Sequence, residues 1–431
     1  MSKKRKTASA VTEPAAAAEQ PAEAAAPVAE SAEQPAEAAA PAAESAEQPA
    51  EAAAPAAESA KPADKKRTAK QPNGFLLLSG YRGAIMGIAA IWILVFHEWM
   101  QVTVNPEDGS FHLINFLERY IKAIGFCGVD IFLLLSGIGL TFAMKKESLL
   151  KFYYRRLRRI LLPFLTIAVI RWRLEHWDFK IFLGNISGVR FYRESMYSFL
   201  WFVPAIVTLY LLFPLYYKLF CKAKDKIMFT AGTITLWMLI TLLVRDKMRG
   251  DLFGFTNRIP VFVIGVLFGW MTQNRKEIIF TLQTWIHLLI TLSLGLYLAY
   301  ISNFFGYGLI VPVSNCCIPN CLIAVSFPFL VSKLLHILER NTVRFGKGLA
   351  KVLGYFGAFS LEFYCVQEWF SGIMIPKLTE RGWTHLGINL AIFVMVTAIS
   401  WAASMVFKYF WKLVELPFRK REPDANTKAG S

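Results

Sequence analysis

The stretch GVDIFLLLSG, from Gly128 to Gly137, decides how the middle of this chain folds. It places Asp130 inside an apolar run of about the 20 residues that a bilayer-spanning helix needs. Ionisable groups at membrane depth are costly, and they line functional cavities rather than facing lipid. His97 lies inside the preceding apolar run, and the arginine-rich RRLRRILLP begins at Arg155 soon afterwards. The sequence therefore predicts a membrane protein with buried chemistry.

The composition agrees with this interpretation. The 431 residues are 55% hydrophobic and 14% aromatic, and the mean hydropathy is +0.40, too apolar for an ordinary soluble protein. The formal net charge is +16, and most of the basic residues lie in short loops between apolar runs. That placement is typical of loops kept at the cytoplasmic side near anionic headgroups. We expect membrane lipids, and no nucleic acid, as partners of these residues.

The N-terminal part has a different character. Residues 24–65 repeat a fourteen-residue unit, AAAPVAESAEQPAE in its first copy. Prolines interrupt any helix there, and the repeat supplies almost no large apolar side chains for a core. We expect a disordered cytoplasmic tail over residues 1–73, with partner binding as the alternative. The membrane domain is expected over 74–420, and a short C-terminal tail over 421–431.

The apolar part predicts an all-α integral membrane protein, a bundle of about ten transmembrane helices. Long continuous runs without alternation favour helices over a barrel. Basic residues gather in every second loop, which favours ten spans with both termini cytoplasmic. Arg171 and Arg173 make the third span the weakest prediction. The expected segments are 82–103, 121–144, 158–175, 198–219, 227–244, 257–272, 278–302, 308–332, 352–374 and 387–412.

A histidine and a carboxylate are expected to meet in the outer part of this bundle. At 1.5 Å per residue, His97 lies about 22 Å from Arg82 along the first segment. Asp130 lies about 13 Å below the outer start of the second segment. We therefore expect Asp130 and His97 at similar depth in the membrane. A neutral histidine oriented by a carboxylate can act as a general base toward a hydroxyl. A hydrogen-bonded pair that only joins two helices is the alternative.

Two further groups of polar residues accompany this pair. In the ninth segment, Gln367 and Glu368 are expected in the same outer third, with Glu362 lower, near the midplane. At the cytoplasmic edge, a dense group of arginines precedes the third segment. Lipid contact and the binding of a phosphorylated cofactor are both open for this group, because guanidinium forks fit phosphate oxygens. Its members are Arg155, Arg156, Arg158 and Arg159.

The six cysteines favour no metal site and no disulfide framework. They form no CxxC pair, and no histidine or carboxylate stands at ligand spacing from them. Most are expected to fill apolar space.

Seven motifs, in order, resemble the acyltransferase 3 family of integral membrane O-acyltransferases. The resemblance runs from Arg82 to Phe418. GIAAIWILVFH ends on His97 like the first span of the family, and GVDIFLLLSG resembles its G-x-D-x-F block. The remaining motifs are KFYYRRLRRILLPF, SFLWFVPAIVTLYLLFPLYY, NRIPVFVIGVLFG, SLEFYCVQEW and VELPF.

Two positions depart from the family pattern. The family arginine eleven residues before the histidine is replaced here by Met86, and Arg82 lies one helical turn earlier on nearly the same face. A histidine that is frequent in the late span is replaced by Gln367, which can form hydrogen bonds but cannot carry a proton. Any second acid–base role would pass to Glu368.

The resemblance implies transfer of an acyl group, expected to be acetyl, from acyl-CoA to a hydroxyl of a cell-envelope glycan or lipid-linked sugar. Acyl-CoA is then a donor substrate, and no permanently bound cofactor is expected. The catalytic roles fall to His97 as base, Asp130 as its orienting carboxylate, and Arg82 at the donor or the developing oxyanion. Coenzyme A phosphates would bind Arg155, Arg156, Arg158 and Arg159. The substrate cavity would involve Trp201, Tyr210, Glu362, Gln367 and Glu368.

The same resemblance implies a multi-pass protein of a bacterial plasma membrane that works alone or with a separate extracytoplasmic partner protein. A transporter or flippase for a glycan or lipid intermediate is the rival interpretation, because buried polar groups also bind and move substrates. Inverted sequence repeats would favour transport, and we find none in the sequence.

Overall fold

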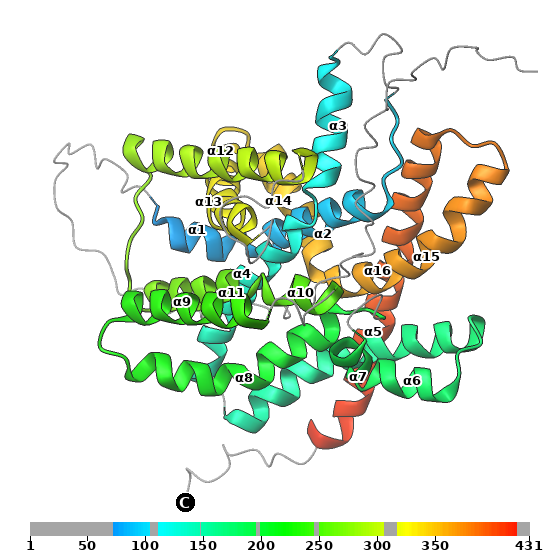
Figure 1. Cartoon of the computed structure of the whole chain (residues 1–431), viewed down its shortest axis with the longest axis horizontal. Helices are drawn as coiled ribbons and strands as arrows, with labels where there is room; N and C mark the ends of the chain where they lie inside the picture. The colour runs from blue at the N-terminus through cyan, green and yellow to red at the C-terminus, as the bar shows by residue number, and fades with distance from the viewer. Residues whose placement is uncertain are drawn as a thin grey trace, which may run out of the picture.

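A computed structural model describes residues 72–103, 111–146, 148–194, 199–244, 250–305 and 317–419. In these ranges the chain is helical, without strands, as predicted (Figure 1). Most of both expected tails lies outside the described residues. The helices are α1 Gly74–Gly80, α2 Arg82–Glu98, α3 Leu113–Ala123, α4 Cys127–Lys146, α5 Leu149–Leu174, α6 Phe179–Ile186, α7 Val189–Arg193, α8 Phe202–Lys222, α9 Lys226–Val244, α10 Gly250–Thr256, α11 Ile259–Gln273, α12 Leu282–Phe305, α13 Cys317–Asn341, α14 Val343–Ala358, α15 Ser360–Glu380 and α16 His385–Arg419.

The multi-span membrane architecture is confirmed, and its helices show how the expected segments are built. Seven described helices are long and apolar enough to cross a membrane, and two bent pairs, α1 with α2 and α14 with α15, raise the count to nine. These pairs turn by 65° and 67° at their breaks. The expected third segment is α5, which does not qualify, because arginines occupy both of its ends. The prediction of about ten spans is therefore approximate.

Glycines allow the central helices to pack backbone against backbone. A Cβ atom at Gly137 of α4 would overlap the carbonyl oxygen of Phe262 in α11, and one at Gly265 would overlap that of Leu134. Helices α2 and α14 meet in the same way, with Gly87 against the Leu353 carbonyl. Small residues at such crossings bring membrane helices into close contact. The central helices are thereby locked together.

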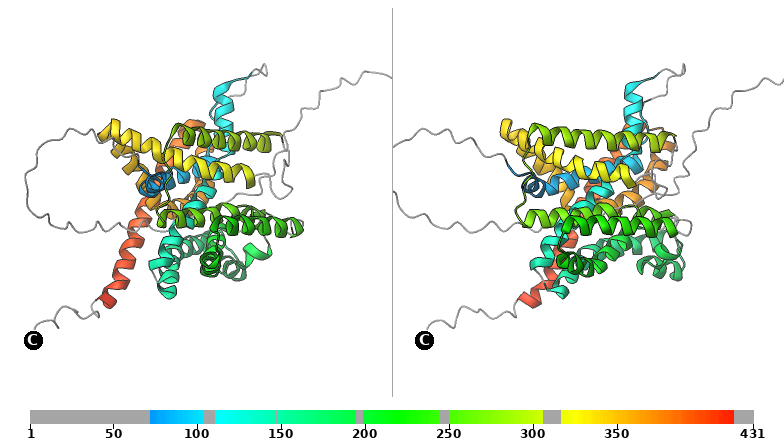
Figure 2. Two further views of the ribbon diagram at one scale, coloured as in Figure 1. Left: turned by 90° about the vertical axis from the view of Figure 1, so that its left-hand side faces the viewer. Right: turned by 60° about the vertical axis from the view of Figure 1, so that its left-hand side comes forward.

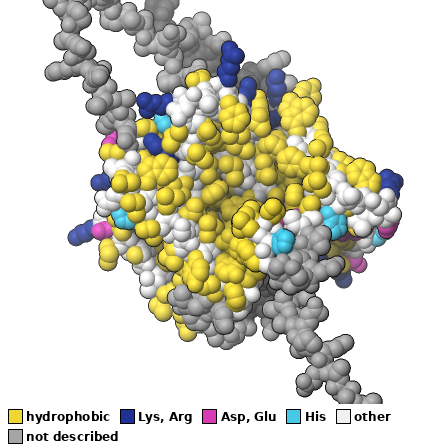
Figure 3. Space-filling view, turned by 90° about the horizontal axis from the view of Figure 1, so that it is seen from above, with side chains coloured by type: hydrophobic (Ala, Val, Ile, Leu, Met, Phe, Trp, Pro, Cys, Tyr) yellow, Lys and Arg dark blue, Asp and Glu magenta, His cyan; other side chains and the backbone are white. Residues whose placement is uncertain are grey.

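Burial separates central from peripheral helices. In the most apolar 18-residue stretch of α4, 83% of the residues are buried inside the protein, whereas the share in α9 and in α12 is 11%. Figure 3 shows a face dominated by apolar side chains, with Lys and Arg gathered toward its edges. Such a surface suits a lipid environment. Helices α9 and α12 therefore present apolar side chains outward.

Three helices position the polar groups of interest. Helix α15 packs against both α2 and α5. The views in Figures 1 and 2 show α12 and α13 on one side of α2, and α5, α8 and the α6–α7 pair on the other. Each of α2, α5 and α15 carries polar residues at two separate levels, with apolar residues between them.

Candidate active site

A cluster of arginines at one level of the bundle is called the basic layer here. Arg82 of α2 interacts electrostatically with Arg156 and Arg159 of α5 and with Tyr210 of α8. Its Nη2 donates a hydrogen bond to the Leu135 carbonyl at 3.2 Å. Three guanidinium groups thus gather where three separate helices meet, and the basic layer is built to hold negative charge.

One carboxylate belongs to the basic layer. Glu362 of α15 interacts electrostatically with Arg159 and with Lys408 of α16. Arg159 also donates to the Ala358 carbonyl at 3.2 Å, which ties α5 to the break between α14 and α15. Glu362 therefore balances only part of the positive charge of the layer.

Buried atoms of this layer lack protein hydrogen-bond partners. Among the described residues, none is within hydrogen-bonding reach of Nε of Arg82, Nε of Arg156, the Tyr210 hydroxyl or Oε2 of Glu362. Buried polar groups are nearly always hydrogen-bonded, and an unsatisfied group is costly. These atoms are the ones that a bound anion or water would satisfy.

The predicted arginine cluster divides into two pairs. Arg156 and Arg159 face the basic layer, and Arg158 forms an ion pair with Glu415 of α16 and lies 5.3 Å from the Trp411 ring centroid. Arg155 is exposed. Residues three apart share a helix face, so 155 and 158 lie on one face of α5 and 156 and 159 on another. The structure brings together only part of the expected phosphate site.

A second cluster, at the far end of the same helices, is called the mixed layer. His97 is half-buried at the end of α2, with its ring 4.9 Å from that of Phe96, edge-on. Glu98 interacts electrostatically with Glu368 and forms a side-chain contact with Ser371, both on α15. Arg171 of α5 pairs with Glu368 at 3.3 Å. This layer combines a histidine with charges of both signs.

Asp130 lies between the two layers and has partners that the sequence did not suggest. Its Oδ2 accepts a hydrogen bond from Nδ2 of Asn320 in α13 at 2.9 Å and lies 3.4 Å from Nε of Arg258. The side chains of Asp130 and Arg258 are 1% and 4% exposed. Arg258 also stacks over Trp201, with its guanidinium carbon 5.7 Å from the ring centroid. Asp130 thus joins α4 to α13 and to the start of α11.

Asp130 is deeper than His97. Gly125 packs on Phe96, and Gly128 packs on Ile93, so α2 and α4 run antiparallel in a fixed register. Continuing this register places Asp130 level with Ile91, about 9 Å along the axis from the level of His97. The expectation of equal depth is not met.

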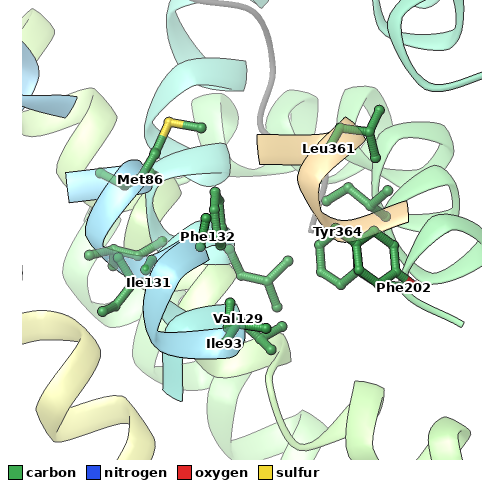
Figure 4. Close-up of a cluster of buried hydrophobic side chains, with 14 of the residues drawn as sticks. Met86, Ile93, Val129, Ile131, Phe132, Phe202, Leu361 and Tyr364 are labelled. Atoms are coloured by element: carbon green, nitrogen blue, oxygen red, sulfur yellow. The ribbon is translucent and has the colours of Figure 1, made fainter. Parts of the chain in front are cut away.

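Close-packed apolar side chains separate the two layers. Figure 4 shows Met86, Ile93, Phe132 and Leu361 in this region, and each is 4% exposed or less. Met86 occupies the position of the family arginine and is part of this core, whereas Arg82 reaches the basic layer. An acyl donor bound across both layers would therefore require these close-packed side chains to move apart.

Two predicted cavity residues lie buried beside this apolar region. Gln367 is 1% exposed, and its Oε1 has no hydrogen-bond partner among the described residues. Trp201 is equally buried, and its Nε1 likewise lacks one in the part of the chain described. Both have spare hydrogen-bonding capacity inside the protein.

Sequence reasoning missed several polar residues. Glu98 directly follows His97, and Arg258 stands inside the NRIPVFVIGVLFG motif, so both had a signal that could have been used. Arg171 was considered only as a break in an apolar run. Asn320 lies in an apolar segment without any motif, and only the fold reveals its contact with Asp130.

Comparison with known proteins gives one match. A family model described as an acyltransferase domain matches residues 85–405, from the first turn of α2 into α16. The matched range contains every predicted site residue except Arg82. No curated protein and no solved structure matches the chain.

Proposed function

The chain belongs to the acyltransferase 3 family, and from that premise we propose that it transfers an acetyl group from acyl-CoA to a hydroxyl of a cell-envelope glycan or lipid-linked sugar. It is a multi-pass membrane acyltransferase, with seven to nine candidate spans among its described residues. The observation that carries the proposal is the pair of polar layers on α2, α5 and α15. One suits an anionic donor and the other holds a histidine.

In this proposal the basic layer binds the phosphates of coenzyme A. Arg156 and Arg159 face the layer together with Arg82, and the unsatisfied Nε atoms of Arg82 and Arg156 can donate to phosphate oxygens. Arg155 and Arg158 would contribute at its rim, where Arg158 must first leave Glu415. Phosphate binding would also favour a rearrangement of Glu362, because its carboxylate competes for Arg159.

Arg82 is better placed for the donor than for an oxyanion. It lies about 22 Å from His97 along one unbroken helix. A group at that distance cannot stabilise charge that develops beside the imidazole. The extended pantetheine arm of coenzyme A has the shape to bridge two such sites, with its phosphates at Arg82 and its thioester near His97.

The mixed layer would carry out the transfer. His97 takes the proton from the acceptor hydroxyl, and the oxygen attacks the thioester carbonyl. The carbon–sulfur bond then breaks, and His97 returns the proton to the departing thiolate, so the products are an ester and free coenzyme A. Gln367 and Glu368 would form hydrogen bonds with the acceptor, Trp201 would shape the region beside Arg258, and Tyr210 would shape the basic layer.

Asp130 would support the histidine from below. Asp130 is bound to Arg258 and Asn320 and lies about 9 Å along the helix axis from His97, so in this proposal it would act on the imidazole through its electrostatic field and not through a direct hydrogen bond. The alternative role is to join helices.

The cellular setting is part of the same proposal. Basic loops between the spans support a plasma-membrane protein with cytoplasmic termini, in a bacterial cell, with acyl-CoA supplied from the cytoplasm. The acceptor would then approach from the His97 side, alone or through an extracytoplasmic partner protein.

Binding of acetyl-CoA by the purified protein tests the proposal. Acetyl-CoA should raise the thermal unfolding midpoint of the wild-type protein in nanodiscs, because a ligand that binds the folded state stabilises it. Free acetate and adenosine serve as controls. No response to any short-chain acyl-CoA would contradict the proposal and would favour transport of a glycan or lipid intermediate.

A further inference from the structure

Helix α3 has part of its polar side, at Glu118 and Lys122, covered by protein. Residues 99–103, which follow His97 and Glu98, form a strap along this side. Glu118 accepts hydrogen bonds from Nε1 of Trp99 at 2.7 Å and from the backbone N–H groups of Val102 at 2.6 Å and Thr103 at 2.8 Å. Nζ of Lys122 donates to the Trp99 carbonyl at 2.6 Å. Glu118 and Lys122 are therefore directed toward the strap, whereas Arg119 is exposed, with its guanidinium carbon 5.8 Å from the Phe304 ring centroid.

The apolar side of α3 is exposed instead. Leu113, Ile114, Leu117 and Ile121 are 59%, 73%, 41% and 49% exposed. At 3.6 residues per turn these four side chains fall within an arc of about 100°. A surface helix of a water-soluble protein does the reverse, with its apolar stripe toward the core. The arrangement on α3 requires an apolar environment outside the protein.

The neighbouring helix identifies that environment. Phe116 and Tyr120, which border the exposed arc, contact the rings of Tyr300 and Phe304 near the C-terminal end of α12. Helix α12 is one of the candidate spans, and few of the residues in its apolar stretch are buried inside the protein. The exposed arc of α3 is thus continuous with a surface that already faces lipid.

The direction of α3 differs from that of the span it touches. Figures 1 and 2 show α3 crosswise to α12 in all three views, projecting from the bundle at the end where α2 finishes. With eleven residues α3 is too short to span a bilayer. A short helix crosswise to the span that it touches, with one apolar side, fits the boundary between headgroups and acyl chains.

We infer that α3 is an in-plane helix of the membrane surface on the His97 side, with Leu113, Ile114, Leu117 and Ile121 inserted into lipid. Its other side holds the strap through Glu118 and Lys122, so the lipid surface fixes the segment that immediately follows His97. The occupant that we assign to the apolar arc is phospholipid, and coverage by a partner protein or a second copy of the chain is an outcome that would overturn this assignment.

Spin labels placed on α3 test this inference without any assay of acyl transfer. A nitroxide at position 114, 117 or 121 in nanodiscs should collide often with molecular oxygen, which partitions into lipid, and rarely with a water-soluble nickel chelate. A label in place of Arg381, an exposed residue after α15, should show the opposite. Exposed Cys221 is replaced by serine in all of these proteins.

Two results would overturn the inference. Frequent collision with the nickel chelate at these positions would place the arc in water, and protection from both reagents would show that protein covers it. If a label disturbs folding, a Leu117→Trp variant in brominated phospholipid replaces it, and the inference requires that the bromine quench the added fluorescence. Because neither readout involves coenzyme A, failure here leaves the proposed function to be judged separately.

Discussion

The basic layer and the mixed layer lie at two levels of the same three helices and differ in charge. Guanidinium groups dominate the basic layer, with Glu362 as the carboxylate among them. The mixed layer sets Arg171 against Glu98 and Glu368 beside a histidine. Unbalanced positive charge suits a polyanionic donor, whereas charges of both signs beside an imidazole suit proton transfer with an uncharged acceptor. This difference in charge assigns donor binding to the basic layer and proton transfer to the mixed layer.

Replacing His97 should have the largest effect on activity. A His97→Ala variant is expected to lose acyl transfer by about 100-fold or more, because a positioned general base contributes that order of rate. Ester content of the surface glycan, compared between cells with equal amounts of membrane-inserted protein, measures the loss. His287→Ala is the matched control, since this intramembrane histidine is exposed on α12.

Replacing Arg159 should affect donor binding. Loss of one charge-assisted hydrogen bond costs about 1.5–3 kcal/mol, so Arg159→Ala should raise the Kd for acetyl-CoA by about 10-fold or more. Lys151→Ala, an exposed cation on the same helix, should leave it unchanged. Calorimetric titration in nanodiscs gives both constants. If wild type and Arg159→Ala had equal Kd values for acetyl-CoA, the donor would not bind at the basic layer.

An Asp130→Asn variant separates catalytic from structural support. Removing the charge leaves Arg258 buried without its partner, which for a buried pair costs about 3–5 kcal/mol. A lower thermal unfolding midpoint is therefore expected, and an added Arg258→Gln should restore part of it. If Asp130 also orients His97, the pH dependence of transfer shifts in the Asn variant at temperatures where it stays folded. An unchanged pH profile would limit Asp130 to joining helices.

Glu118 should make the strap sensitive to acid. Partial burial raises the pKa of this carboxyl, but hydrogen bonds from Thr103, Trp99 and Val102 outweigh burial and lower the pKa to about 2. A depressed pKa means that stability is full above the ordinary value of 4.5 and is lost as pH falls from there toward 2. A nitroxide at Val102 should become more mobile over that range. A Glu118→Gln variant should show high mobility at every pH, and mobility that is independent of pH in the wild type would contradict this.

The helical architecture could be predicted from the sequence because membrane helices consist of long apolar runs. The break at Tyr81 coincides with the start of the expected first segment at Arg82, whereas the break at Phe359 falls inside the expected ninth segment, where no proline marks it. The apolar pattern also predicted a third span at residues 158–175, which corresponds to α5 and does not qualify as a span. Arginines at both ends of α5 interrupt its apolar run and serve the two polar layers instead.

The candidate site was only partly readable. Spacing along α5 could have separated Arg156 and Arg159 from the other two arginines, because residues three apart share a face. The pairing of Asp130 with Arg258 and Asn320 depends on how α4, α11 and α13 are placed, and no local pattern encodes it. Glu98 was overlooked although it adjoins His97. Its contacts with α15 arise only from the packing of two helices that are far apart in sequence.

Binding and turnover of acetyl-CoA, measured together on wild type, His97→Ala and Arg159→Ala, test the assignment of donor and chemistry to separate layers most directly. With an acceptor extract present, the wild-type protein should bind acetyl-CoA and release free coenzyme A. His97→Ala should bind it with wild-type affinity and release coenzyme A at least about 100-fold more slowly, and Arg159→Ala should bind it weakly. The acetyl group of the acetyl-CoA is isotopically labelled in this experiment. If His97→Ala released coenzyme A at the wild-type rate and the labelled acetyl group were recovered as acceptor ester, His97 would not be the catalytic base.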